Sequence, residues 1–421
     1  WDHADESNIS ETTMMQDKGQ NQVVIDWLIN GKADRVFVTT PDSAISYGEL
    51  VGRLPERRGR ELTSVAPGRD IAGVMEIFAG IGSGPLRISD GRGWVGQTVP
   101  EEVMTILSTS GTTGEPKLVP LSIDNWRAAV VASAQHLGHT EDDVWLIAMP
   151  LHHVGGLSVL FRSAYVGGGV RLLPRFEASS FADSLSGEVT IASVVPTMLR
   201  RILDHDRRIY RGLRAVLVGG GPIPQGLLGE AAERGLPVLP TYGMTETCAQ
   251  IATLRPGSQL EYKADLLPGV EAMIDQSGRI ALRGDQVFSG YLGDPSRRPG
   301  DWFVTGDLGE MVGDRSLRIL GRADDVIVTG GENVDPALVE MMVGLHHDVV
   351  DAMVVGVPSW EWGNEVVCLY QGTADPSILD DWARERLDPF QVPKRWLKVD
   401  SIPTTALGKP DRNRGRDLAA D

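Results

Sequence analysis

Residues 107–119 read LSTSGTTGEPKLV, with two serines, three threonines and two glycines between an apolar run and a single lysine. Small hydroxyl residues and glycines allow a loop to direct several backbone N–H groups at one anion, and Lys117 adds a positive charge. The spacing G-x-x-x-x-G-K-[ST] of the common nucleotide loop is absent, because Leu118 follows the lysine. The alternative is a polar surface turn between two elements. The lysine and the apolar lead-in favour a phosphate-binding loop.

The chain around this loop alternates apolar runs with segments of helical character. Ser122 is suited to cap a helix just after the loop, with Asp124 in its first turn. Further apolar runs lie at 144–149, 170–173, 190–195, 213–218 and 237–239, and further helical segments at 196–206 and 225–234. Apolar strands that alternate with amphipathic helices predict α/β layers around a mostly parallel sheet.

The later part of the chain has a different pattern. From about residue 270 to 322, short strands and turns follow one another (RIALRG, WFVTGDLGEM, RSLRILGR), which predicts a small β-rich subdomain. A short charged segment, GRADD at 321–325, then marks a domain boundary. We therefore expect a large N-terminal domain over 1–322 and a small α+β C-terminal domain over 323–421.

The composition is that of an ordinary globular protein. The 421 residues are 42% apolar and 23% charged, and the net charge of −17 argues against a nucleic-acid partner. Cys248 and Cys368 provide neither a metal-ligand spacing nor a disulfide framework, which fits a reducing compartment. The N-terminal WDHADESNIS lacks the pattern of a signal peptide, and no apolar run reaches membrane-spanning length. We expect a cytoplasmic protein without membrane insertion.

Four strings carry a family resemblance: STSGTTGEPK (108–117), TYGMTET (241–247), TGDL (305–308) with GRADDVI (321–327), and PTTALGKPDR (403–412). In this order they resemble the adenylate-forming superfamily of acyl-CoA synthetases, amino-acid adenylation domains and luciferases. The resemblance covers the chain well from about residue 100 onward and poorly before it. It implies a two-step reaction that uses ATP, Mg²⁺ and CoA. A carboxylate is adenylated with release of pyrophosphate, and the acyl group is then transferred to the CoA thiol.

The resemblance places the ATP and AMP site on these strings and on the GGGPIP segment at 219–224. The phosphate loop would use Thr109, Ser110, Gly111, Thr112, Thr113, Gly114 and Lys117. The rest of the nucleotide would contact Gly220, Gly221, Pro222, Thr241, Tyr242, Gly243, Met244, Thr245, Asp307 and Arg322. The aromatic face of Tyr242 suits stacking on adenine, and the carboxylate of Asp307 suits the ribose hydroxyls. The alternatives are a core tyrosine beside a strand and an aspartate that only caps its own turn.

The resemblance also implies three groups around the reacting atoms. Thr245 would donate its hydroxyl to the α-phosphate, and Glu246 would bind Mg²⁺, which prefers oxygen ligands. Lys409 would bridge the carboxylate and α-phosphate oxygens as charge develops. Without the resemblance, an exposed glutamate and a solvated tail lysine would be the better interpretations of Glu246 and Lys409.

In the family, the two domains rotate relative to each other between the half-reactions. The resemblance therefore implies roles for a hinge residue and for residues that line the CoA tunnel. Asp324 would be the hinge. Gly330 and Gly331 would line the tunnel for the pantetheine arm of CoA, where missing side chains leave room. The partners would be a small-molecule carboxylate, ATP and CoA. The sequence does not decide between a monomer and a homo-oligomer.

The substrate class is inferred from MPLHHVGGLSVL at 149–160. Amino-acid adenylation domains carry an aspartate in an F-D-x-S string here, and its absence disfavours an amino-acid substrate. This stretch, together with GGGPIP (219–224) and TYGMTETCAQI (241–251), is most similar to the o-succinylbenzoate–CoA ligases of menaquinone biosynthesis. Their pattern P-L-F-H-x-x-G-L-S places His153 on the family histidine. His153 would order the substrate carboxylate or gate the thiol tunnel, and a buried histidine with satisfied hydrogen bonds is the alternative. The acyl pocket would contain His153, Gly155, Gly219 and Gly243.

Two features depart from the family pattern. His152 replaces an aromatic residue and makes the pocket wall more polar, which leaves open a ligase for another aryl or fatty carboxylate. A non-catalytic nucleotide-binding relative is a third possibility, which the intact motif residues disfavour.

The second departure is the length of the first subdomain. Residues 51–107 leave room for about one strand–helix unit fewer than typical relatives have, and 67–80 (PGRDIAGVMEIFAG) resembles a contracted strand and helix. We therefore expect a contracted first subdomain.

Overall fold

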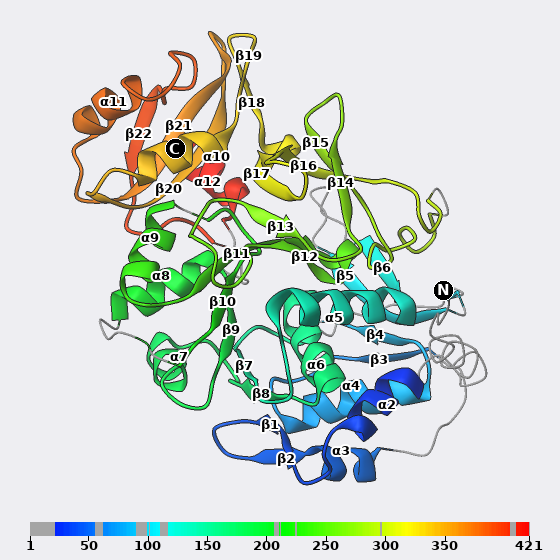
Figure 1. The fold of residues 1–421 in the computed structure, drawn as a ribbon. Helices are drawn as coiled ribbons and strands as arrows, with labels where there is room; N and C mark the ends of the chain where they lie inside the picture. The colour runs from blue at the N-terminus through cyan, green and yellow to red at the C-terminus, as the bar shows by residue number, and fades with distance from the viewer. Residues whose placement is uncertain are drawn as a thin grey trace, which may run out of the picture.

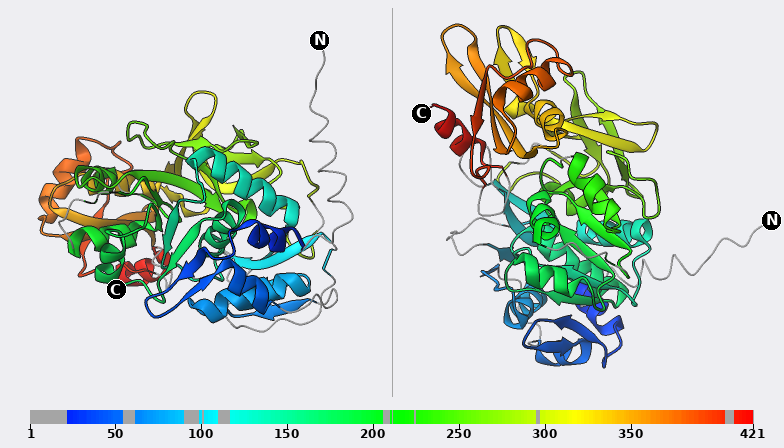
Figure 2. Two further views of the ribbon diagram at one scale, coloured as in Figure 1. Left: turned by 60° about the horizontal axis from the view of Figure 1, so that its bottom comes forward. Right: turned by 90° about the vertical axis from the view of Figure 1, so that its left-hand side faces the viewer.

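The computed structural model describes residues 22–54, 62–89, 99–100, 102–109, 117–205, 210, 212–223, 225–294, 297–404 and 410–420. Within them a large α/β body is followed by a smaller α+β unit that contains the last described helix (Figure 1). The right-hand view of Figure 2 shows this smaller unit at one end of the large body, opposite the first helices of the chain. The predicted fold class is confirmed.

Thirteen of the described strands form one sheet, and the centre of this sheet is parallel. Across the sheet the parallel strands are β1 (Val36–Thr39), β8 (Gly169–Leu172), β7 (Val144–Ile147), β9 (Ile191–Val194), β10 (Ala215–Val218) and β11 (Val238–Met244). Strands β9 and β10 are buried along their whole length, as strands of a parallel sheet covered on both faces are. All five apolar runs predicted as strands are confirmed.

Helices cover both faces of this parallel region. Trp145 and Ile147 of β7 belong to one hydrophobic core, whereas Leu146 between them belongs to another. The first core includes α5 (Ile123–Leu137) and α6 (Val154–Val166), and the second includes α7 (Ala178–Ser184), α8 (Pro196–His205) and α9 (Gln225–Glu233). Successive side chains of a strand point to opposite faces, so one strand contributes to both cores.

The first part of the chain forms a second, four-stranded sheet. Its strands, in order, are β3 (Thr63–Val65), β4 (Leu86–Ile88), β5 (Val103–Thr109) and β6 (Lys117–Ser122). Helix α4 (Ile71–Ser83) connects the parallel pair β3 and β4, and Asp70 caps its start by accepting a hydrogen bond from the Gly73 N–H. The expected contracted strand and helix at 67–80 is therefore a helix only, because the strand precedes it. Helices α2 (Gln22–Asn30) and α3 (Tyr47–Arg53) also belong to this first part of the chain, whereas β2 (Ala44–Ser46) pairs antiparallel with β1 as the edge strand of the main sheet.

Beyond β11 the main sheet continues with antiparallel strands. In spatial order they are β12 (Ala249–Thr253), β13 (Ala264–Leu266), β17 (Ser316–Arg322), β16 (Phe303–Met311), β15 (Arg279–Arg283) and β14 (Glu271–Ile274). Short antiparallel strands thus begin about twenty residues earlier than the sequence pattern indicates. They pair with the parallel region through β12, so the two form one continuous sheet.

The C-terminal unit has a core of its own around a three-stranded sheet. The sheet consists of β20 (Val349–Ser359), β21 (Gly363–Gly372) and β22 (Arg395–Lys398), and a hairpin of β18 (Ile327–Thr329) and β19 (Glu332–Val334) precedes it. The helices are α10 (Pro336–Gly344), α11 (Pro376–Arg384) and α12 (Arg412–Ala420). Among the described residues, no helix is both long and apolar enough to cross a membrane.

Candidate active site

The predicted site residues gather where the parallel strands end. His153 follows β7, Gly219 follows β10, and Thr241 lies in the last part of β11. Neighbouring parallel strands present their carboxyl ends at the same edge, which is where open α/β sheets bind ligands. Strands β16 and β17 add Asp307 and Arg322 from the antiparallel side of the sheet.

The TYGMTET string forms a tight turn from β11 to β12 through the 3-10 helix η1 (Thr245–Thr247). A side chain at Gly243 would place its Cβ 1.8 Å from the Ala249 carbonyl oxygen, so only glycine permits this approach of the two strands. Cys248 and Ala249 adopt φ values of 52° and 77°, which are unusual for residues other than glycine. Gly243 therefore shapes the turn that presents Thr245 and Glu246.

Tyr242, Asp307 and Arg322 form one hydrogen-bonded cluster. The Tyr242 hydroxyl donates to Oδ2 of Asp307 at 2.7 Å, and Nη1 of Arg322 donates to Oδ1 at 3.0 Å. Burial, followed by the charge of Asp307, raises the pKa of Tyr242 well above its ordinary value, which keeps the phenol a donor. The Asp307 carboxylate is thus held by other strands, and the interpretation of Asp307 as a simple turn cap is wrong.

Arg322 also connects this cluster to the predicted hinge. Its Nη2 lies 3.5 Å from Oδ2 of Asp324, in the short 3-10 helix η2 (Ala323–Asp325) that follows β17. Gly306 makes room for the guanidinium, because a Cβ there would lie 2.8 Å from Nη2. The same arginine therefore contacts the predicted ribose carboxylate and the predicted hinge carboxylate.

Glu246 and the lysine of the phosphate loop contact the same tyrosine. The side chain is only 9% exposed, so the alternative of an ordinary surface glutamate is wrong. Tyr291 donates its hydroxyl to Oε1 of Glu246 at 2.8 Å, and Nζ of Lys117 lies 4.8 Å from the centroid of the same tyrosine ring. One nearly buried carboxylate beside a lysine suits Mg²⁺, which takes its other ligands from phosphate and water. Sequence reasoning missed Tyr291, and only its place in the SGYLG turn could have indicated it.

The described residues reach both ends of the phosphate loop. Thr109 at the end of β5 and Lys117 at the start of β6 are register partners, and the Thr109 hydroxyl donates to the Lys117 carbonyl at 3.5 Å. Five predicted phosphate contacts lie outside the described residues: Ser110, Gly111, Thr112, Thr113 and Gly114. Lys409 also lies outside them.

The predicted acyl-pocket residues come from three strand ends. His153 is half-buried at the N-cap of α6, and its ring centroid lies 4.2 Å from that of His152. Gly155 is in the first turn of the same helix. Gly219 packs tightly on β11, because a Cβ there would lie 2.6 Å from the Thr241 side chain. His153 is thus not a fully buried core residue.

The remaining predicted residues lie in two other turns, one after β10 and one in the C-terminal unit. Gly220, Gly221 and Pro222 follow β10, with Gly220 at a φ of 79°. Gly330 and Gly331 form the turn of the β18–β19 hairpin with φ values of 57° and 86°, where glycine is favoured.

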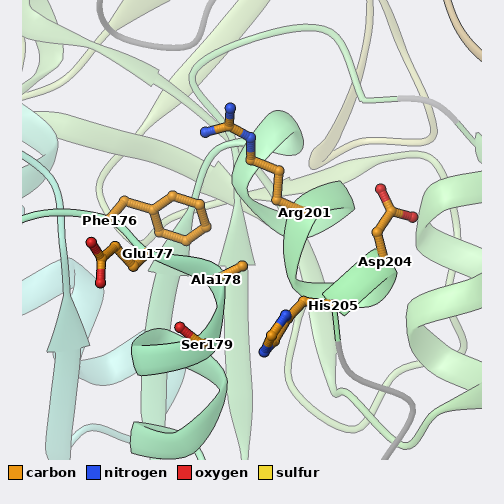
Figure 3. Close-up of a pocket in the computed structure, with 7 residues that line it drawn as sticks. All are labelled: Phe176, Glu177, Ala178, Ser179, Arg201, Asp204 and His205. Atoms are coloured by element: carbon orange, nitrogen blue, oxygen red, sulfur yellow. The ribbon is translucent and has the colours of Figure 1, made fainter.

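A separate pocket of about 590 Å³ lies between the start of α7 and the second half of α8 (Figure 3). Its lining residues are Phe176, Glu177, Ala178, Ser179, Arg201, Asp204 and His205. None of the predicted site residues lines it, and most of its polar side chains are exposed. The pocket is therefore not part of the candidate active site.

Comparisons with known proteins show the family of this chain. Residues 32–292 match the AMP-binding enzyme family, and residues 338–409 match the AMP-binding enzyme C-terminal domain. The chain belongs to the AMP-binding enzyme family. Among curated relatives, it is 39% identical over 337 residues to the 2-succinylbenzoate–CoA ligase of Bacillus licheniformis, covering 75% of this chain and 70% of the relative. It is 37% identical over 332 residues to the enzyme of that name from Bacillus subtilis, covering 74% and 68%.

Solved structures show the same fold. The o-succinylbenzoate CoA synthetase of Bacillus subtilis, in complex with the acyl-adenylate intermediate, aligns with a TM-score of 0.79 and 29% identity, covering 94% of this chain and 98% of that chain. The same enzyme in complex with ATP and a magnesium ion aligns with a TM-score of 0.78. The ATP-bound MatB of Rhodopseudomonas palustris, at 23% identity and a TM-score of 0.81, shares the fold.

Proposed function

We propose that this chain is an ATP-dependent o-succinylbenzoate–CoA ligase of menaquinone biosynthesis. It would adenylate o-succinylbenzoate with release of pyrophosphate and then transfer the acyl group to CoA, with release of AMP. The observation that carries the proposal is the cluster of Tyr242, Asp307 and Arg322, together with Glu246, which follows β11, and Lys117 of β6, both of which contact Tyr291. The named activity of the relatives that align over most of the chain supports the substrate.

In the first half-reaction, a substrate carboxylate oxygen forms a bond to the α-phosphorus of ATP, and the bond to pyrophosphate breaks. Tyr242 would stack on adenine, while Asp307 and Arg322 would hold the ribose. Lys117 would bind the leaving phosphates, and Thr245 and Lys409 would stabilise the charge on the α-phosphate. Glu246 would hold Mg²⁺, which neutralises charge on the polyphosphate.

In the second half-reaction, the CoA thiol attacks the acyl carbon and AMP leaves. The C-terminal unit would turn about Asp324 between the two steps and remove Lys409 from the site. The hairpin turn at Gly330 and Gly331 would then line the path of the thiol, since it lacks side chains that would block it. The Arg322–Asp324 contact supports this role of the hinge, because the proposed ribose-binding arginine lies 3.5 Å from the proposed hinge carboxylate.

The acyl group would lie near His153, Gly155, Gly219 and Gly243. The absence of an aspartate in 149–160 argues against an amino-acid substrate. A second candidate is a CoA ligase for another aryl or fatty carboxylate. The observation that favours it is His152, which adds a polar ring 4.2 Å from His153 where an aromatic residue is typical.

Pyrophosphate release across a panel of carboxylates separates these candidates. We expect turnover with o-succinylbenzoate and little with benzoate, fatty acids or amino acids. Turnover with benzoates or fatty acids but none with o-succinylbenzoate would contradict the proposal. Absence of pyrophosphate release with every acid, despite ATP binding, would favour a non-catalytic relative.

The variant Lys409→Ala tests the assigned chemistry. Adenylate formation should be abolished while ATP binding, measured by calorimetry, remains largely intact. Thioester formation from pre-made adenylate should survive far better, because the lysine has left the site by then. Unchanged turnover in the full reaction would rule out the role of Lys409.

A further inference from the structure

The loop between β15 and β16 reaches back to two elements of the candidate active site. The Phe288 N–H donates to the Glu246 carbonyl at 2.8 Å, and the Leu292 N–H donates to the Leu118 carbonyl in β6 at 2.9 Å. These backbone bonds hold Tyr291 between η1 and β6, although 45 residues separate it from Glu246 in the sequence.

Tyr291 contacts both ionic groups that the proposed function assigns to MgATP. Its hydroxyl donates to Oε1 of Glu246 at 2.8 Å, and its ring face lies 4.8 Å from Nζ of Lys117. Phe288 packs edge-on against the same ring with a centroid distance of 4.9 Å, which fixes the ring orientation.

Two opposite charges contact this tyrosine without pairing with each other. Lys117 and Glu246, both within the described part of the chain, form no ion pair within 4.0 Å, and each instead contacts Tyr291. A direct pair would have to break before a phosphate and a cation could bind, since each charge would already be compensated. Tyr291 instead gives each charge a neutral partner: the ring face for the ammonium and the hydroxyl for the carboxylate. One hydrogen bond to Oε1 leaves further carboxylate lone pairs free for a cation.

We propose that Tyr291 is a positioning residue for MgATP. It holds the Glu246 carboxylate and the Lys117 ammonium apart, so that both are available to one magnesium–polyphosphate group. This inference rests on the proposed function, because it takes ATP and Mg²⁺ as ligands. Tyr291 does not touch the reacting atoms, so its effect falls on the affinities for Mg²⁺ and ATP and not on the chemical step.

Tyr291→Phe removes the hydroxyl and keeps the ring. We expect the Mg²⁺ concentration for half-maximal ATP binding to rise about tenfold, as for loss of a hydrogen bond to a charged group, with kcat largely restored at saturating Mg²⁺. Equilibrium binding of ATP, titrated with Mg²⁺ and without any acyl substrate, measures this directly. A change smaller than twofold would overturn the proposal.

Tyr291→Leu additionally removes the ring face beneath Lys117. We expect ATP to bind about tenfold more weakly than in Tyr291→Phe at saturating Mg²⁺, while AMP, which lacks the outer phosphates, binds as in the wild type. An equal loss of AMP and ATP affinity would indicate a general structural role and contradict the inference. The matched control is Tyr165→Phe on α6, whose ring packs edge-on against Trp27 away from these residues and whose substitution should change neither affinity.

These outcomes separate the inference from the proposed function. If the wild type binds MgATP but turns over no o-succinylbenzoate, the substrate assignment fails, and the binding comparison still decides the role of Tyr291. If the wild type binds no MgATP, the proposed function fails, and the inference fails with it.

Discussion

The two ends of the parallel sheet use the same residue types for different purposes. At the amino ends of β7, β9 and β10, Asp143, Thr190 and Arg214 each stand directly before a strand. Arg214 donates to both carboxylate oxygens of Asp143 at 2.6 Å, and the Thr190 hydroxyl donates to Oδ1 at 2.7 Å. This cluster binds three neighbouring strands together, so it stabilises the fold.

Beyond the carboxyl end of the parallel part of β11, the corresponding aspartate and arginine are Asp307 and Arg322. They lie in the antiparallel strands β16 and β17, and the hydroxyl of Tyr242 in β11 donates to Asp307, so we call this group the carboxyl-end cluster. The side chains of Arg322 and Asp307 are 43% and 11% exposed, compared with 33% and 5% for Arg214 and Asp143, so the carboxyl-end cluster is somewhat more exposed. We expect the ribose to approach on the side of Arg322. An Asp–Arg pair therefore indicates function or stability only once its position on the sheet is known, because only the carboxyl ends adjoin the binding crevice.

The sharpest test of this difference is Arg214→Ala. The substitution leaves Asp143 buried without its cation, so we expect a loss of about 3 kcal/mol in the free energy of unfolding. Activity per folded molecule should stay within about twofold of the wild type. Urea unfolding and pyrophosphate release measure the two quantities. The control is Arg175→Ala, whose pair with Glu177 is exposed and should contribute little. A large loss of activity at unchanged stability would contradict the purely structural role of the amino-end cluster.

Asp307→Ala tests the opposite end of the sheet. We expect adenylation kcat/KM to fall about a hundredfold, which corresponds to about 2.7 kcal/mol, because the ribose loses its acceptor. The free energy of unfolding should change far less than in Arg214→Ala. Glu310→Ala is the matched control, because Glu310 lies on the same strand and only pairs with Arg318 at the surface. If Asp307→Ala unfolds the protein and leaves its kinetics intact, the carboxyl-end cluster is structural.

A smaller effect concerns the pH dependence of the amino-end cluster. Burial alone would raise the pKa of Asp143, but hydrogen bonds from Arg214, the Thr140 N–H and Thr190 outweigh it and lower the pKa to about 2. Because the folded-state pKa is depressed, this stabilisation is complete above the unfolded-state value near 4 and is lost as the pH falls toward 2. The pKa difference corresponds to about 2 to 3 kcal/mol.

Asp143→Asn isolates this contribution. The difference in unfolding free energy between this variant and the wild type should be constant from pH 7 to about pH 5 and shrink below about pH 4. Urea unfolding at several pH values measures it. A difference that stays constant down to pH 3 would show that the charge of Asp143 does not stabilise the fold.

Much of the fold could be predicted from short stretches of sequence. The apolar runs of β9 and β10 and the cap at Ser122 are local patterns, and the structure confirms them. The predictions were less accurate where elements are short. Strands β12 and β13 precede the expected start of the β-rich part, because strands of three to five residues show little periodicity.

Some residues of the candidate site could be predicted from the sequence, whereas their contacts with distant residues could not. Tyr242, Glu246 and Asp307 lie in recognisable strings, so the sequence alone identified them as candidates. The burial of Glu246 and the contact of Tyr291 with it were not predicted, because nothing near Tyr291 in the sequence indicates a partner 45 residues away.

The sequence by itself determined the order of strands and helices, the turn chemistry of the motifs and the membership of a family. All three depend on residues that are close in sequence, because backbone preferences and motif spacing are local properties of the chain. Only the tertiary structure decided which charges meet: Tyr242 with Asp307 across 65 residues, and Asp143 with Arg214 across 71. Such contacts depend on which strands lie side by side in the sheet and on their register. Both follow from the packing of the two hydrophobic cores on its faces.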